Sequence, residues 1–196
     1  SRIDQAINAP SYQNTVGGIS AGLEQTLDVT DGYAFVGIVG GYTFGSIESG
    51  ATSATSQFGH LGTYGSYRSN GWRSSASATY NHGRFKTERL LNVGTGQLTA
   101  ANTLYSNGFA GEIEVSYEVL KLLGENQHSF RPYARLKGAT GRIGGGTETG
   151  AGILNLTASP FSASQLYAET GAVFSTEFVE DNRVISPSLG LGYRHR

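Results

Sequence analysis

The sequence has no cysteine and no methionine, only four prolines and one tryptophan, and only 15% charged residues. Without cysteine the chain has no disulfide framework, which is compatible with an exported protein that uses none. Without methionine the native start codon is not part of this chain, so we expect a processed product or an excised piece. The lack of a signal peptide therefore carries no information about export.

The sequence also lacks an excess of charge of one sign, and it lacks long apolar runs. The formal net charge is −1, which gives no electrostatic footprint for nucleic acid. No window approaches the run of about 18 apolar residues that a membrane-spanning helix requires. Any contact with a membrane must therefore be made by strands.

The chain does have 29 glycines, 11 tyrosines and 9 phenylalanines in 196 residues. That length corresponds to one domain, large enough to bury a core or to close a barrel. A chain with so few charges and so many small polar residues must place its polar side chains somewhere. A barrel with a polar lumen provides that place.

Alternation with a period of two is clear in residues 72–80, which indicates a strand. Trp72 and Tyr80 lie at the two ends of one face, and only small residues lie between them. Ser-Asn-Gly at 69–71 predicts a tight hairpin turn before this strand, since Asn and Gly tolerate positive φ. Aromatic ends on one face and a polar opposite face are typical of a transmembrane β-strand.

Two later segments alternate apolar residues with charged ones. Residues 104–119 place carboxylates on one parity, and residues 130–140 place basic side chains on one parity, so that antiparallel neighbours can pair across the ladder. In a soluble sandwich these charges would line the solvent face, whereas in a barrel they line the lumen. We favour the barrel, and the predicted lumen-lining residues are Glu24, Glu112, Glu114, Arg131, Arg135 and Glu169.

Aromatic residues cluster near the predicted strand ends, as expected for interfacial girdles. The alternative is that aromatics are common in any strand, but the small residues in the strand middles weaken it. The predicted interfacial aromatics are Tyr42, Tyr67, Trp72, Tyr80, Tyr117, Phe174 and Tyr193.

The alternating segments predict about eight strands of about ten residues, the length that crosses a bilayer when tilted. Short turns are expected at 30–32, 69–71 and 180–182, and long polar loops at 45–57, 85–102 and 141–163. We therefore predict an all-β fold, an antiparallel transmembrane up-and-down β-barrel. Residues 1–15 are predicted to be a linker or a segment that enters the lumen, and residues 16–196 the outer-membrane barrel domain.

Patterns that could carry chemistry are weak. Residues 18–22 match the G-x-S-x-G pattern, but a nucleophile elbow needs a strand-to-helix turn, whereas strand alternation runs through Ser20. The four histidines lie far apart, without ligands at the spacing of a zinc site. We predict no enzymatic activity, no catalytic residue, no metal and no cofactor.

Six segments carry a family likeness when taken in order. They are GGISAGLEQ (17–25), VGIVGGYTFG (36–45), LGTYGSYRSNGWRSSASATYNHGRFKTER (61–89), FAGEIEVSYEV (109–119), RPYARL (131–136) and PSLGLGYRHR (187–196). In order and loop length they resemble the C-terminal translocator domain of bacterial autotransporters, over nearly the whole chain after Tyr12. The resemblance matches Glu24 to the acidic position of a glycine-rich early strand, and Arg89 to the arginine that begins a surface loop.

The resemblance implies a twelve-stranded barrel in the outer membrane of a Gram-negative bacterium. It also implies an α-helical linker in the lumen, a passenger domain carried to the cell surface by type V secretion, and the barrel assembly machinery as a partner. The family's opening strand and last strands are not recognised in this chain. We therefore expect either part of a longer barrel or a shortened barrel of about eight strands.

Two alternatives stay open from the sequence. One is a small eight-stranded outer-membrane protein whose long surface loops act in adhesion or binding, with closure between residues 16–27 and 184–193. The other is a soluble ligand-binding barrel with an apolar lumen, which would require Glu112, Glu114, Arg131 and Arg135 to face water outside.

Overall fold

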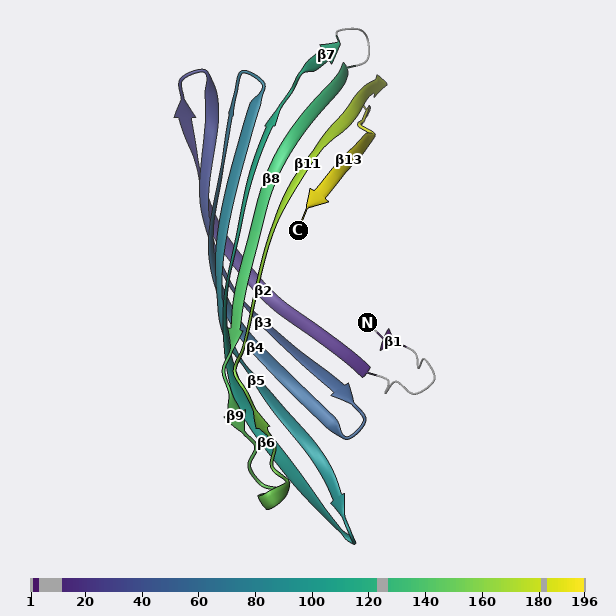
Figure 1. Ribbon diagram of the computed structural model, residues 1–196. Helices are drawn as coiled ribbons and strands as arrows, with labels where there is room; N and C mark the ends of the chain where they lie inside the picture. The colour runs from purple at the N-terminus through teal and green to yellow at the C-terminus, as the bar shows by residue number, and fades with distance from the viewer. Residues whose placement is uncertain (1, 4–11, 123–126, 181–182, 196) are drawn as a thin grey trace.

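The computed structural model describes residues 2–3, 12–122, 127–180 and 183–195, which form almost only antiparallel strands (Figure 1). In chain order the elements are β1 (Arg2–Ile3), β2 (Tyr12–Val29), β3 (Gly32–Ser49), β4 (Thr52–Ser69), β5 (Trp72–Val93), β6 (Gly96–Tyr117), β7 (Leu120–Leu122), β8 (Gln127–Ile143), β9 (Gly146–Thr147), the 3₁₀ turn η1 (Gly152–Leu154), β10 (Thr157–Ala158), β11 (Phe161–Glu180), β12 (Arg183–Ile185) and β13 (Ser188–His195). In these ranges no helix has the length and apolar character needed to cross a membrane.

The main sheet is an up-and-down meander. The strand order is β1-β2-β3-β4-β5-β6-β8-β11, with β12 and β13 both pairing with β11 and β7 pairing with β8. Each long strand therefore lies beside its neighbour in sequence, which confirms the predicted antiparallel all-β fold. The sheet is twisted and curved, and β2 and β13 lie apart at its edges (Figure 1). Within the described ranges these two strands do not pair, although closure between them was one expectation from the sequence.

The start of the first long strand differs slightly from the predicted domain boundary. β2 begins at Tyr12, so residues 12–15 already belong to the sheet. The division into a linker at 1–15 and a barrel domain at 16–196 stays a prediction, because residues 4–11 are not among those described.

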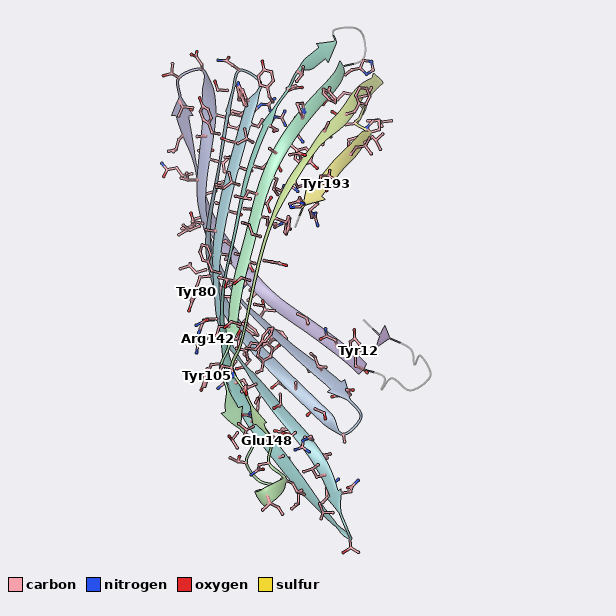
Figure 2. The ribbon with its side chains drawn as sticks, viewed as in Figure 1. Tyr12, Tyr80, Tyr105, Arg142, Glu148 and Tyr193 are labelled. Atoms are coloured by element: carbon pink, nitrogen blue, oxygen red, sulfur yellow. The ribbon has the colours of Figure 1, made fainter. Side chains whose placement is uncertain are left out.

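The register gives the sheet two faces with different chemistry. We call the face with Ile38, Tyr80 and Phe109 the outer face, and the face with Glu114 and Arg135 the inner face. Figure 2 shows Tyr80 on the convex side of the sheet, so the inner face lines its hollow side. The large apolar side chains of the outer face are exposed.

The sheet has almost no apolar core of its own. Among the described side chains the buried hydrophobic ones are only those of Ala100 and Ala151. A soluble domain of this length normally buries many more apolar side chains. The apolar side chains lie instead on the convex surface, where lipid can cover them.

Two of the predicted short turns are present at one end of the sheet. Asp31 and Asn70 adopt positive φ values of 61° and 48°, and Gly71 follows with 85°. These are the conformations that two-residue hairpins require. The third predicted turn, at 180–182, lies partly outside the described residues.

The prediction of long loops at the other end is wrong. β3 and β4 continue until a turn at Gly50, and β5 and β6 continue until a turn at Gly94, with φ values of 59° and 61°. Seven strands therefore have 17 to 22 residues rather than about ten. The connection at 141–163 also contains structure, namely the end of β8, the pair β9 and β10, and η1.

The physical reason is that the polarity of the two faces reverses beyond Tyr80. On β5 the outer face then carries Arg84 and Lys86, whereas the inner face carries Phe85, whose ring lies 5.0 Å from that of Phe58. Neither face is continuously apolar in this part of the sheet. The ladder continues, but the outward apolar alternation that marks a spanning strand ends.

Rings of the inner face lie across glycines of the neighbouring strand. A Cβ atom on Gly37 would lie 2.4 Å from the Tyr64 ring, and one on Gly41 would lie 2.4 Å from His60. Gly40, on the outer face of the same strand, would meet no atom closer than 3.7 Å. Glycine is therefore required on the inner side of β3, because the ring of β4 occupies the space of a side chain.

Candidate functional site

An acid–base row crosses the inner face of four adjacent strands, β6, β8, β11 and β13. In the register, Glu114 lies opposite Arg135, Arg135 opposite Glu169, and Glu169 opposite Arg194. The side chains thus alternate acid, base, acid and base from strand to strand. Opposite charges on directly facing positions stabilise an antiparallel sheet.

Arg135 is the centre of this network. Its Nε atom donates a hydrogen bond of 2.9 Å to Oε2 of Glu114 and lies 3.2 Å from Oε1 of Glu112. Its Nη1 atom lies 3.4 Å from Oε1 of Glu169. Lys137 Nζ lies 2.7 Å from the other oxygen of Glu112. Arg135 therefore lies among three carboxylates, and partial burial of the charges is offset by pairing.

Glu169 links the row to the edge strand. Glu169 is only 9% exposed. It accepts a hydrogen bond of 2.9 Å from the Tyr133 hydroxyl and bonds of 2.9 and 2.7 Å from Nε and Nη2 of Arg194. The Arg194 guanidinium also lies 4.7 Å from the centre of the Tyr167 ring. These contacts join β8, β11 and β13 on the inner face.

The structure brings together four of the six residues predicted to line a lumen, namely Glu112, Glu114, Arg135 and Glu169. The other two lie elsewhere on the inner face. Glu24 is on β2, opposite Gly37 and next to the Tyr64 hydroxyl. Arg131 belongs to a second cluster near the short turns. That all six line a closed lumen stays a prediction.

The analysis of the sequence did not select Tyr133 and Arg194 as site residues. Alternation with a period of two places both side chains on the inner face. Tyr133 shares the parity of Arg135, and Arg194 has the parity opposite to the outward Tyr193. The register that places them beside Glu169 joins segments far apart in the chain, and alternation alone does not give it.

The second cluster contains three arginines around a hollow of about 420 Å³. Arg68 and Arg73 lie 3.9 and 3.6 Å from the carboxylate of Glu118, and Arg131 also lines the hollow. Within the described part of the chain, the buried Nε atom of Arg73 has no hydrogen-bond partner. Such an arrangement can bind a further anionic group.

The predicted interfacial aromatics all lie on the outer face, and their side chains are between 38% and 70% exposed. Trp72 and Tyr117 lie at the end with the short turns, with ring centres 4.8 Å apart. Tyr80 lies opposite Phe109 toward the other end. Their role at the two membrane surfaces stays a prediction.

A serine and a histidine also meet on the inner face. Ser20 Oγ lies 3.0 Å from Nε2 of His60. Ser20 lies in the middle of β2 rather than at a strand-to-helix turn, and no described carboxylate pairs with His60. A nucleophile needs a base that a third group orients. Among the described residues there is also no group of three or more metal-ligating side chains close enough to hold a metal ion.

Outside the spanning part, an ion pair fixes the connection between β8 and β11. Arg89 Nη2 lies 2.5 Å from Oε2 of Glu148, and Nε lies 3.3 Å from Oε1. Glu148 also accepts a hydrogen bond of 2.8 Å from the backbone N–H of Leu156. Figure 2 shows Glu148 at the end of the sheet opposite the short turns. The hydrogen bonds from Arg89 and from the Leu156 N–H lower the pKa of Glu148.

Comparison with known proteins decides the family. The model of the autotransporter beta-domain family matches residues 1–196. This chain belongs to the autotransporter β-domain family. The predicted family resemblance is confirmed.

Two solved autotransporter structures have the same fold. The beta domain of the Bordetella autotransporter BrkA is 18% identical, with a TM-score of 0.58, and the match covers 94% of this chain and 71% of that one. The translocator domain of the autotransporter NalP from Neisseria meningitidis is 10% identical, with a TM-score of 0.59, and the match covers 98% of this chain and 71% of that one. No curated protein sequence matches this chain.

As an autotransporter β-domain, the chain forms a translocator barrel of the bacterial outer membrane. It serves type V secretion and anchors and exports a passenger domain that is part of the same polypeptide. Domains of this family are transport barrels rather than enzymes. The exposed apolar side chains of the outer face are the surface that such a barrel presents to lipid.

Proposed function

We propose that the inner face lines a water-filled lumen through which the α-helical linker of the passenger passes, and that the domain acts by transport without catalysis. The observation that carries the proposal is the continuous acid–base row on the hollow side of the sheet, opposite an apolar outer face. Charged side chains on both faces or an apolar inner face would suit a soluble domain better. The lumen-lining residues of this proposal are Glu24, Glu112, Glu114, Arg131, Arg135 and Glu169.

The proposal requires that the two edges of the sheet, at β2 and β13, are paired, either with each other or with further strands of a longer barrel. In lipid, each unpaired backbone N–H or C=O group costs several kcal/mol, so an open edge is not stable there. The barrel assembly machinery is the expected partner for insertion and closure. The outer-face aromatics, among them Tyr42, Tyr67, Tyr80 and Phe174, would then form the two interfacial girdles with Trp72, Tyr117 and Tyr193.

The arginine cluster gives the linker a place to bind. Arg68, Arg73 and Arg131 line the hollow together with two carboxylates, those of Glu118 and Glu177, so positive charge is in excess there, and the Nε atom of Arg73 lacks a partner among the described residues. A carboxylate on the linker would complete this cluster with charge-assisted hydrogen bonds. The linker is therefore expected to be held at the end of the lumen that carries the short turns.

The test fills the lumen without touching the lipid face. Ser75 and Ser77 lie on the inner face opposite Glu114 and Glu112, whereas Ala76 and Ala78 lie on the outer face of the same strand. In the full-length autotransporter, the double variant Ser75→Trp/Ser77→Trp is expected to lower several-fold the amount of passenger that external protease removes from intact cells. The matched variant Ala76→Trp/Ala78→Trp is expected to export normally, because its indoles face lipid.

Heat-modifiable migration on gels shows whether each variant has folded. Equal passenger exposure in the two folded double variants would contradict a lumen on the inner face.

A further inference from the structure

A cationic patch lies on the outer face directly beyond the apolar band. On β5, Tyr80 is followed on the same face by Arg84 and Lys86. Arg142 of β8 joins them, since it lies opposite Asn107, in the row between Phe109 and Tyr105. Figure 2 shows Arg142 on the convex side between Tyr80 and Tyr105.

Two of these three charges have no carboxylate partner in the described part of the chain. Both side-chain bonds of Arg84, of 3.0 and 2.8 Å, go to the neutral amide oxygen of Gln57. Arg142 is exposed and makes no ion pair with any described residue. Lys86 does pair with Glu88, at 2.7 Å. The patch therefore has an excess of positive charge.

The surface is hollowed beside Arg84 and Lys86. A groove of about 270 Å³ is lined by Arg84, Lys86, Gln57 and the two threonines Thr55 and Thr103. Guanidinium, ammonium and hydroxyl groups that converge in one groove are donors suited to a tetrahedral oxyanion. Arginine in particular matches the geometry of phosphate through two parallel hydrogen bonds.

The neighbouring surface identifies the rest of the ligand. Next to the cations, Tyr80, Phe109 and Ile113 are about half exposed on the outer face, and they belong to the apolar band that lipid covers. A ligand that contacts both regions must carry a phosphate and acyl chains. In a barrel the longer connections face outward, and the long connection between β8 and β11, residues 144–160, lies at this end of the sheet. The groove therefore lies at the level of the outer leaflet.

We propose that Arg84 and Lys86 bind the phosphate group of an outer-leaflet lipid in this groove, that Arg142 adds positive charge beside it on the same face, and that the acyl chains pack on Tyr80, Phe109 and Ile113. The site makes no use of the inner face or of passenger transport. It requires only that the outer face contacts the membrane. A failure of this proposal therefore leaves the lumen proposal untouched, and the two have different readouts.

The test measures lipid retention by the full-length autotransporter. The protein is reconstituted in phosphatidylcholine vesicles that contain lipopolysaccharide or the same glycolipid after enzymatic removal of its phosphates. It is then extracted in mild detergent, and bound glycolipid is counted by native mass spectrometry. The wild type is expected to retain the phosphorylated form and to lose the dephosphorylated one.

Three variants give the residue assignment. Removal of all three charges in Arg84→Gln/Lys86→Gln/Arg142→Gln is expected to weaken retention about 100-fold, because each cation near an anionic lipid surface contributes about a factor of five. The variant Arg84→Lys/Arg142→Lys keeps the positive charges but loses the planar guanidinium groups that can bind phosphate through two parallel hydrogen bonds. Intermediate retention is therefore expected. Glu88→Gln frees Lys86 and is expected to strengthen retention.

Every variant is first tested for heat-modifiable folding and for passenger exposure on cells, which should equal those of the wild type. Undiminished retention in a folded triple variant would overturn the proposal. So would equal retention of the dephosphorylated lipid. Displacement of the bound lipid by millimolar inorganic phosphate would show a site for free phosphate, and it would likewise overturn the assignment to a lipid.

Discussion

At the scale of single residues, the inner face depends on glycines that lie beneath rings. Tyr64 lies across Gly37 and His60 across Gly41, and in each case a Cβ atom would come within 2.4 Å of the ring. The close approach lets the large side chains of β4 lie flat on β3 instead of filling the hollow side. Small residues on the inner face therefore keep space open above the sheet.

The corresponding prediction compares two alanine substitutions on β3. Gly37→Ala forces the Tyr64 ring to move, and overpacking of this kind typically costs about 1–3 kcal/mol. Gly40→Ala points to the outer face, where the nearest atoms lie at 3.7 and 3.9 Å, so no loss of stability is expected. The stability of each variant is measured as the temperature at which its folded band disappears on gels. An equal fall of this temperature in the two variants would contradict the steric account.

The same residues show how far the sequence could predict the site. The alternation of side chains along the strands assigned Glu112, Glu114 and Arg135 to one face, because the residues that flank each of them are apolar. It did not show that two further residues lie apart from them. Glu24 lies on β2, which four strands separate from β8, and Arg131 lies on β8 itself but nearer the short turns, in the second cluster. The contact of Tyr64 with Gly37 depends on register between strands, which side-chain alternation leaves open.

At the scale of elements, the strands change character along their length. β5 presents an apolar outer face from Trp72 to Tyr80 and a charged one from Arg84 onward, while its ladder to β4 and β6 is continuous. The spanning part was predictable because lipid imposes outward apolar residues. The outer extension was predicted as a loop because its glycine, serine and threonine residues show no outward apolar alternation.

The connection between β8 and β11 gives a pH prediction. The hydrogen bonds to Glu148 lower its pKa in the folded protein below the ordinary value of 4.5. A group with a lowered folded pKa contributes its stabilisation above the ordinary value, and the contribution is lost as the pH falls through the folded pKa. The connection is therefore expected to stay attached to Arg89 of β5 near neutral pH and to detach from it below pH 4.5.

Distance measurement between nitroxide labels can follow this detachment. The chain has no cysteine, so labels can be placed at Asn92→Cys, near the β5–β6 turn, and Ile153→Cys in η1. A narrow distance distribution at pH 7 should broaden below pH 4.5, and Glu148→Gln should show the broad distribution at every pH. A wild-type distribution that stays narrow in acid would contradict the role of the Arg89–Glu148 pair.

At the scale of the whole molecule, one sheet separates two environments. Its outer face carries apolar side chains that no protein core covers, and its inner face joins Glu114, Arg135, Glu169 and Arg194 across four strands. The family assignment and this division of the faces agree, because an autotransporter β-domain needs lipid on one side and a wet passage on the other. The fold class was predictable from alternation alone, whereas the extent of the hairpins was not.

The most direct test of this division is a nitroxide scan of β5 in the full-length autotransporter, reconstituted in liposomes. Single cysteines at positions 74–79 are labelled, and the accessibility of each label to oxygen and to a water-soluble nickel chelate is measured. Labels at Ser74, Ala76 and Ala78 are predicted to be accessible to oxygen, and labels at Ser75, Ser77 and Thr79 to nickel. Accessibility without alternation, or with the two sets exchanged, would contradict a lipid-facing outer face and a water-facing inner face.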